Sequence, residues 1–99
     1  MFIVLYRWRV KPLLEQQFIE SWSEITDYFR KNYDSLGSRL HRRSDGLFYG
    51  YAQWKSVEDR KNAFTNDNSE IIEASLKMRE SIDESFSEIV LESIADYLV

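Results

Sequence analysis

The stretch SRLHRRSDGLFYGYAQW, Ser38 to Trp54, decides the fold, because it predicts two strands joined by a tight turn in the middle of the chain. Asp45-Gly46 is a strong hairpin signal, since glycine readily adopts the positive φ angle that such a turn requires. The residues after it are rich in aromatic side chains, as is typical of strands. We therefore expect strands over residues 38–43 and 47–54.

The pairing within this hairpin determines which side chains share a face of the sheet. With a two-residue loop, His41 lies opposite Gly50 and Arg39 lies opposite Ala52. The residues expected to share one face are then Arg39, His41, Arg43, Phe48, Gly50, Ala52 and Trp54. A three-residue loop would shift this pairing by one residue and change every partner.

The segments before the hairpin predict a strand followed by a long helix. Alternate residues of segment 2–10 belong to opposite faces of the predicted strand, and both faces contain apolar side chains. Lys11-Pro12 ends this strand, and proline is well placed at the start of a helix. Residues 12–33 then carry an apolar stripe at helical spacing, formed by Leu14, Phe18, Trp22, Ile25 and Phe29.

The segments after the hairpin predict two shorter helices and a last strand. Ser56 is a candidate N-cap for a helix that reaches Phe64, and a second helix is expected over residues 69–82. A strand is expected over residues 86–95, although Glu92, Ala95 and Asp96 would also suit a helix. The order strand, helix, strand, strand, helix, strand favours a ferredoxin-like α+β sandwich. In this βαββαβ fold, a four-stranded antiparallel sheet has its helices on one face.

Composition narrows the classes of function. The chain has 99 residues, no cysteine, one histidine and a net charge of −4. We expect a single domain over residues 1–99, without disulfides or a histidine-rich metal site. An acidic chain is a poor nucleic-acid binder, and no segment has the length of a membrane span. The N-terminal apolar run is interrupted by Arg7 too early for a signal peptide, so a cytoplasmic protein is expected.

The apolar residues on both faces of the predicted strands imply a second covering layer. Helices can cover only one face of the sheet, so the other face needs another partner. In a chain this short, we expect that partner to be a second copy, packed sheet against sheet around a two-fold axis.

Three segments resemble the antibiotic biosynthesis monooxygenase family of small dimeric α+β-barrel proteins. They are RWRVKPLLEQQFIESW (residues 7–22), LGSRLHRRSDGLFYGYAQW (residues 36–54) and KSVEDRKNAF (residues 55–64). The resemblance implies a dimeric α+β barrel. It leaves the activity open, because the superfamily includes cofactor-free oxygenases, haem-degrading enzymes and proteins without a known role.

The chain departs from the haem-degrading branch, which uses an Asn on the first strand, a Trp after the third strand and a His on the next helix. Here the corresponding positions hold Tyr6-Arg7 and Ala63-Phe64, and residues 69–84 contain no histidine. Haem degradation by that route is therefore disfavoured, although haem binding at an unusual site stays open as a weaker alternative.

The remaining candidate chemistry needs no metal, flavin or haem. A phenol or quinol that loses a proton can donate single electrons to dioxygen, provided that the protein binds the ring and favours the anion. In this hypothesis, His41 is the base, Arg39 is the anion stabiliser, and Trp22, Phe48 and Trp54 are substrate-binding residues. This reading predicts a cofactor-independent monooxygenase of a small aromatic substrate. In the alternative interpretation, His41 is a surface or interface residue, Arg39 protects the sheet edge, and Trp22 and Trp54 belong to the core or the dimer interface. The alternative is a non-catalytic dimeric module that binds a small ligand or supports another enzyme.

Overall fold

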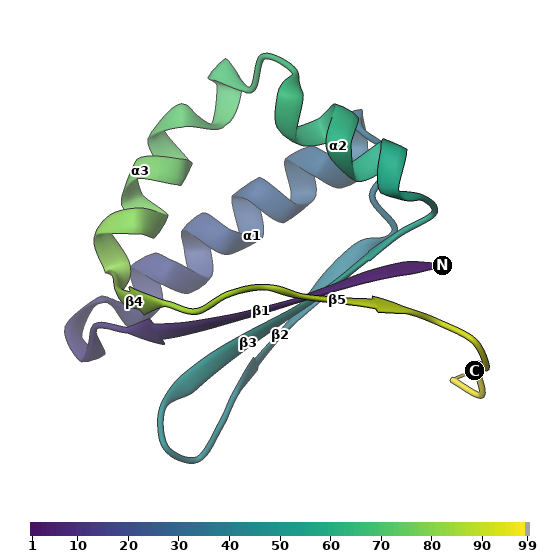
Figure 1. The fold of residues 1–99 in the computed structure, drawn as a ribbon. Coiled ribbons are helices and arrows are strands. Elements are labelled where there is room, and N and C mark those ends of the chain that lie inside the picture. Colours follow the sequence, from purple (N-terminus) through teal and green to yellow (C-terminus); the bar gives the residue numbers. More distant parts are fainter. Residues whose placement is uncertain (99) are drawn as a thin grey trace.

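The computed structural model describes residues 1–98 as one antiparallel sheet with helices on a single face (Figure 1). The strands are β1 (Phe2–Val10), β2 (Gly37–Arg42), β3 (Leu47–Trp54), β4 (Ile82–Ser85) and β5 (Ile89–Glu92). The helices are α1 (Glu15–Asn32), α2 (Val57–Thr65) and α3 (Ile72–Ser81), and the 3₁₀ turns η1 (Pro12–Leu14) and η2 (Ser69–Ile71) precede α1 and α3. The predicted α+β architecture is confirmed.

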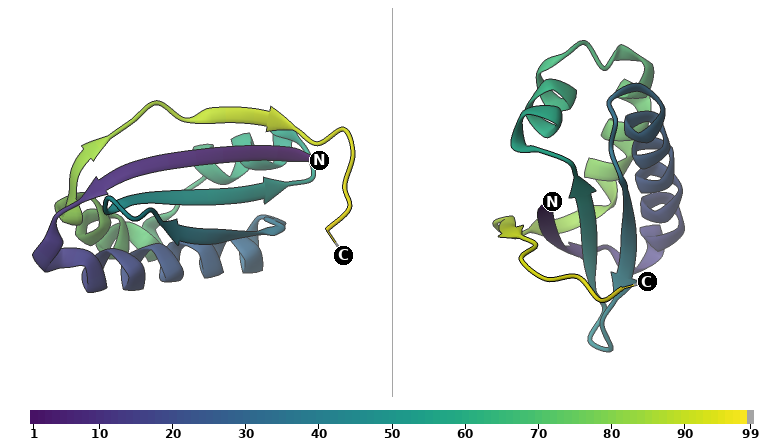
Figure 2. Two further views of the ribbon diagram at one scale, coloured as in Figure 1. Left: turned by 90° about the horizontal axis from the view of Figure 1, so that it is seen from below. Right: turned by 90° about the vertical axis from the view of Figure 1, so that its right-hand side faces the viewer.

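The central strand of the sheet is β1. It pairs with β3 on one side, and with β4 and β5 on the other, while β2 forms the edge beyond β3. Helices α1, α2 and α3 lie on one side of this sheet, and the opposite side, here called the open face, carries no helix (Figure 2). The arrangement is that of two split βαβ units.

The last strand differs from the sequence prediction of one strand over residues 86–95. It begins earlier, at Ile82, and is divided into β4 and β5 by residues 86–88. The chain still follows β1 through this break, because the Phe86 amide donates to the Arg7 carbonyl at 3.1 Å. The Arg7 guanidinium lies 5.6 Å from the Phe86 ring centroid and donates to the Ser87 carbonyl at 3.0 Å. At the break, these side-chain contacts take the place of the regular backbone hydrogen bonds between strands.

The hairpin between β2 and β3 has a three-residue loop, so the predicted two-residue pairing is wrong. His41 lies opposite Tyr49, Arg39 opposite Tyr51, and Leu40 opposite Gly50. The Arg43 amide donates to the Leu47 carbonyl at 2.8 Å, and this bond closes the loop. Glycine in the left-handed region at the end of such a loop is a common solution, and Gly46 has φ +89°.

The two helical predictions around the hairpin are confirmed in outline. The long helix begins with the 3₁₀ turn at Pro12 and ends at Asn32. The Ser56 hydroxyl accepts the Asp59 amide at 3.2 Å and caps α2, as expected. In residues 1–98, no helix combines the length and the apolar character that a membrane crossing needs.

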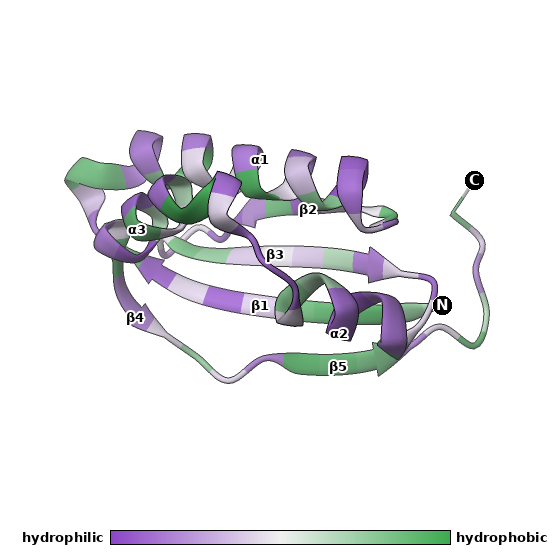
Figure 3. Ribbon diagram, turned by 90° about the horizontal axis from the view of Figure 1, so that it is seen from above, coloured by the Kyte–Doolittle hydropathy of each residue, from purple (hydrophilic) through white to green (hydrophobic). Residues whose placement is uncertain are grey.

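The core lies between the helices and the sheet, in two clusters of buried side chains. One cluster contains Val4, Phe29 and Trp54, and the other contains Trp8, Phe18 and Phe48. Since these strand residues alternate along β1 and β3, the residues between them belong to the open face. Figure 3 shows that β5, at the margin of the sheet, is hydrophobic along much of its length.

Candidate functional site

A largely apolar cavity of about 180 Å³, here called the inner cavity, lies between the helices and the sheet. Its aromatic lining comes from strands and helices far apart in sequence and includes Tyr6, Trp8, Trp22, Trp54 and Phe64. Thr26 and Ser38 add hydroxyl groups on the side towards β2. Concave sites with an apolar lining and a few polar groups are typical of small-molecule binding.

Gly50 shapes the floor of the inner cavity, because the Trp8 ring lies directly over it. A Cβ atom at position 50 would come within 2.8 Å of Trp8 Cη2 and 2.9 Å of Trp8 Cζ3. The Trp8 ring also stacks on Tyr6, with centroids 5.5 Å apart and planes 7° apart. The absence of a side chain at Gly50 thus allows two stacked aromatic rings to line the cavity.

Tyr6 connects the inner cavity to a partly buried charge. Arg60 Nη2 donates to the Tyr6 hydroxyl at 3.0 Å and to Glu88 Oε2 at 2.7 Å. The Arg60 side chain is 19% exposed, and its guanidinium lies 4.9 Å from the Phe64 ring centroid. Charge-assisted hydrogen bonds of this kind are the strong ones, so the guanidinium is held firmly against the phenol.

The Tyr6 hydroxyl is available as a hydrogen-bond donor. Burial raises the pKa of Tyr6, and the Arg60 charge opposes that rise only partly, so the phenol is neutral at physiological pH. Its oxygen accepts from Arg60, and within residues 1–98 its own proton has no acceptor. A neutral phenol polarised by an adjacent cation is suited to donate to an oxygen atom of a ligand in the cavity.

A second polar group on the cavity wall also lacks a partner. Trp54 Nε1 is buried and makes no hydrogen bond within the part of the chain that the structure describes. Buried indole N–H groups usually find an acceptor. Trp54 lines the cavity, so a ligand or water there is a suitable candidate for that acceptor.

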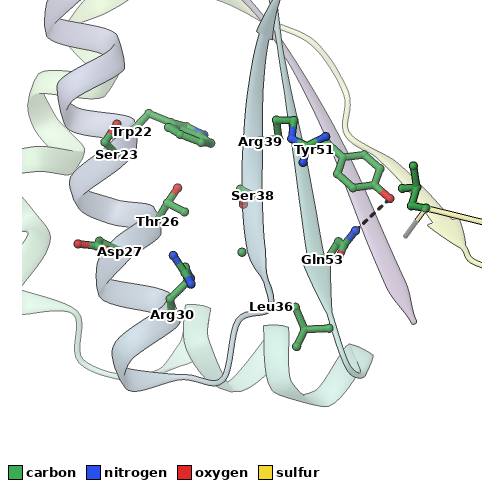
Figure 4. Close-up of a pocket in the computed structure, with 12 residues that line it drawn as sticks. Trp22, Ser23, Thr26, Asp27, Arg30, Leu36, Ser38, Arg39, Tyr51 and Gln53 are labelled. Carbon is green, nitrogen blue, oxygen red and sulfur yellow. Dashed lines mark hydrogen bonds between the residues drawn. The ribbon is translucent and has the colours of Figure 1, made fainter.

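The inner cavity adjoins a larger and more polar hollow of about 590 Å³, here called the edge groove, which extends from α1 around the edge strand β2 to Tyr51 and Gln53 on the open face (Figure 4). The two spaces share Trp22, Thr26 and Ser38 in their linings. These three residues, here called the mouth, therefore lie where the two spaces adjoin.

The structure separates the residues that the sequence prediction grouped into one site. Trp22 and Trp54 line the inner cavity, as a substrate-binding role requires. Phe48 instead packs in the core against Phe18, with ring centroids 5.3 Å apart. His41 is exposed and lies on the open face.

The one-residue shift of the hairpin causes this separation. Because Leu40, rather than His41, lies opposite Gly50, both Arg39 and His41 point to the open face. A shallow hollow extends around the edge strand β2. Trp22 and Phe48 border it on the helix side of the strand, and Arg39 and His41 border it on the open face. The expectation that His41 and Arg39 share a face with Phe48 and Trp54 is therefore wrong, and their catalytic roles remain untested predictions.

Sequence reasoning missed Tyr6 and Arg60 as site residues. Tyr6 falls on the helix-facing set of β1, so alternation was a usable signal for its position. Arg60 lies in the first turns of a capped helix, where an arginine is ordinarily a surface residue, and 54 positions separate it from Tyr6. Among residues 1–98, His, Asp and Glu side chains form no group of three that could hold a metal ion.

Comparison with known proteins finds similarity at the level of structure. Neither a protein-family model nor a curated protein matches the sequence. A candidate antibiotic biosynthesis monooxygenase from Caulobacter crescentus aligns with a TM-score of 0.80 at 15% identity, over 95% of this chain and 90% of its own. A variant of SnoaB, a cofactor-independent oxygenase from Streptomyces nogalater, aligns with a TM-score of 0.79 at 12% identity, over 97% and 95%.

A conserved protein from Methanosarcina mazei has the same fold, with a TM-score of 0.74 at 15% identity, over 91% of this chain and 89% of its own. At such identities the comparison establishes the fold alone. The resemblance expected from the sequence is confirmed at that level: the chain has the fold of proteins named antibiotic biosynthesis monooxygenases.

Proposed function

We propose that the protein is a cofactor-independent monooxygenase that oxidises a small phenolic or quinol-like aromatic molecule in the inner cavity. The observation that carries this proposal is the Tyr6 phenol, which is backed by Arg60 and lies on the wall of an apolar cavity. The structural similarity to SnoaB, named as a cofactor-independent oxygenase, supports the same reaction class.

The size of the inner cavity suits one aromatic ring. An engineered protein cavity of about 150 Å³ binds benzene, and the inner cavity measures about 180 Å³. Trp22 and Trp54 offer ring contacts on its walls, and offset or edge-on packing between aromatic rings is favourable. The substrate ring would enter through the mouth at Trp22, Thr26 and Ser38.

In the proposed reaction, the protein favours the substrate anion and keeps water away from it. The Tyr6 O–H donates to the substrate oxygen, and the Arg60 charge behind it stabilises the phenolate. The substrate proton passes to solvent through the mouth of the cavity. The anion then transfers an electron to dioxygen, and the substrate radical recombines with superoxide to form the carbon–oxygen bond of a peroxide anion. The peroxide regains from solvent the proton that the substrate released. Its O–O bond then breaks as the second hydrogen leaves the same carbon, and water departs. Overall, RH₂ and O₂ give RO and H₂O, and the substrate is the two-electron reductant.

Oxygen uptake with a panel of substituted quinols tests this proposal. Losing one preorganised donor to an oxyanion lowers kcat by about 10²-fold or more, so Tyr6→Phe should lower uptake to a similar degree. Tyr49→Phe is the matched control, because the Tyr49 hydroxyl accepts from Arg43 at 2.9 Å on the open face, away from the cavity. His41→Ala should retain uptake as well.

Three results would contradict the proposal. Equal uptake by Tyr6→Phe and wild type would remove Tyr6 from the site, and loss of uptake in His41→Ala alone would restore the histidine hypothesis. Ring binding without any uptake would favour a non-catalytic ligand-binding module.

We also propose that two copies of the chain pair through their open faces. Apolar side chains are exposed on β5, at the margin of the sheet, and in the residues that follow it. Leu91 is 45% exposed, and Ile94 and Tyr97 are more than 90% exposed. Such patches are typical of protein interfaces. Burying the open face in a two-fold dimer would remove the Leu91 side chain from water.

Light scattering after size exclusion tests the dimer. Wild type should elute at twice the 11.9 kDa chain mass, and Leu91→Lys should shift the protein towards the monomer. Leu76→Lys is the matched control, since Leu76 is 57% exposed on α3, on the other side of the sheet. A wild-type monomer at micromolar concentration would refute the dimer.

A further inference from the structure

We infer that the substrate carries an acidic group, which the edge groove binds through Arg30 and Arg39 while the aromatic ring occupies the inner cavity. This inference rests on the proposed function, since it places the ring of that substrate in the inner cavity. It specifies further that the substrate is acidic and longer than a single aromatic ring.

The size of the two spaces argues for a substrate longer than one ring. The inner cavity holds about 180 Å³, whereas the adjoining edge groove holds about 590 Å³ and has a more polar lining. Because Trp22, Thr26 and Ser38 belong to both linings, a chain attached to the ring can pass directly from one space to the other.

The edge groove presents two arginines that have no acidic partner within residues 1–98. Arg30 comes from α1 on the helix side of the sheet, whereas Arg39 comes from the edge strand β2 and points to the open face; both border the groove, because it extends around that edge. Within residues 1–98, neither forms an ion pair or a side-chain hydrogen bond. Other basic residues, among them Lys11, Lys55 and Lys61, also lack an ion pair there, but Arg30 and Arg39 border the same groove. In a chain with a net charge of −4, two unpaired guanidinium groups on one groove mark a local site for an anion.

The one acidic residue on this lining does not neutralise the arginines. Asp27 borders the groove, but its carboxylate lies 3.5 Å from Lys31 Nζ. Figure 4 shows Arg30 on the side of α1 that faces β2, whereas Asp27 points away from that strand. The same view places Arg39 beside Tyr51, whose hydroxyl accepts from Gln53 Nε2 at 3.3 Å, so further polar groups adjoin the arginines.

Calorimetric binding of two matched probes tests the inference. The probes are 3-(4-hydroxyphenyl)propanoate and its primary amide, which share the ring, the hydroxyl and the chain and differ in charge. A charge-assisted hydrogen bond should make the acid bind about tenfold more tightly than the amide. Arg30→Gln and Arg39→Gln should each reduce that ratio towards one, and added salt should reduce it in wild type.

Two substitutions control for a general effect of charge. Lys61→Gln makes the same charge change at an exposed residue of α2 outside the groove lining, and Arg42→Gln does so on the same strand as Arg39. Both should retain the preference for the acid. If all four variants lost the preference for the acid equally, the anion site would be overturned, because the preference would then depend only on the net charge of the protein.

The outcomes separate this inference from the proposed function. Equal affinity for acid and amide would overturn the anion site while ring binding in the inner cavity still stands. Binding of neither probe would overturn both. Tighter binding of the acid that persists in Arg30→Gln and Arg39→Gln would place the acidic group elsewhere.

Discussion

Gly50→Ala offers a quantitative test of the packing at the floor of the inner cavity. The new Cβ would lie 2.8 Å and 2.9 Å from two atoms of the Trp8 ring, whereas carbon atoms in favourable contact are about 3.5–4.0 Å apart. The ring has little freedom to retreat, because it is buried and contacts Tyr6 on one side and Phe18 on the other.

The size of the effect follows from two opposing contributions. Overpacking a core by one methyl group costs about 1–3 kcal/mol. Replacing glycine by alanine in a strand recovers about 0.5–1 kcal/mol of backbone entropy, and Gly50 is not among the glycines with a positive φ angle. We therefore expect a net loss of about 1 kcal/mol, within a range of about 0–2.5 kcal/mol, in the free energy of unfolding, and about 4–8 °C in Tm for each kcal/mol.

Urea unfolding at fixed protein concentration, followed by tryptophan fluorescence, would measure this loss. Trp8→Phe removes the two ring atoms that the new Cβ meets, so Gly50→Ala should cost less in the Trp8→Phe background than in wild type. Gly46→Ala is the control, because it meets no atom within 4 Å and is strained only through its φ of +89°, so Trp8→Phe should not relieve it. Strict additivity of Gly50→Ala with Trp8→Phe would refute the packing argument.

Two further predictions concern ionisation and capping. Because burial raises the pKa of Tyr6, the unfolded chain releases that phenolic proton first, and the free energy of unfolding should fall as pH rises above about 10. Tyr6→Phe should lessen this fall in a pH series of urea titrations, and an unchanged slope would contradict the burial of the phenol. Ser56→Ala removes the hydroxyl that accepts the Asp59 amide and should cost about 1 kcal/mol, whereas Ser56→Asp should retain most of the stability. Equal stability of all three proteins would show that the cap is dispensable.

Much of the fold was predictable because local signals and tertiary structure agree. The strand over residues 47–54 and the Ser56 cap are read directly from residue types and spacing. The break between β4 and β5 was not predictable, since it depends on contacts between Arg7 and residues almost 80 positions away.

The candidate site was less predictable, because one turn controls the position of every β2 side chain. Asp45-Gly46 is compatible with a two-residue or a three-residue loop, and in the folded chain the Asp45 carboxylate accepts the Leu47 amide at 3.1 Å within the longer loop. A shift of one residue moved His41 and Arg39 to the open face. Trp22 and Trp54 kept their predicted positions near the cavity, because helical and strand periodicity place them without reference to the turn.

A crystal structure with 3-(4-hydroxyphenyl)propanamide bound would test the central claim most directly. We predict that the ring lies in the inner cavity between Trp22 and Trp54, with its hydroxyl oxygen about 2.6–3.2 Å from the Tyr6 hydroxyl. A ring bound on the open face beside His41, with the inner cavity unchanged, would contradict the proposed site.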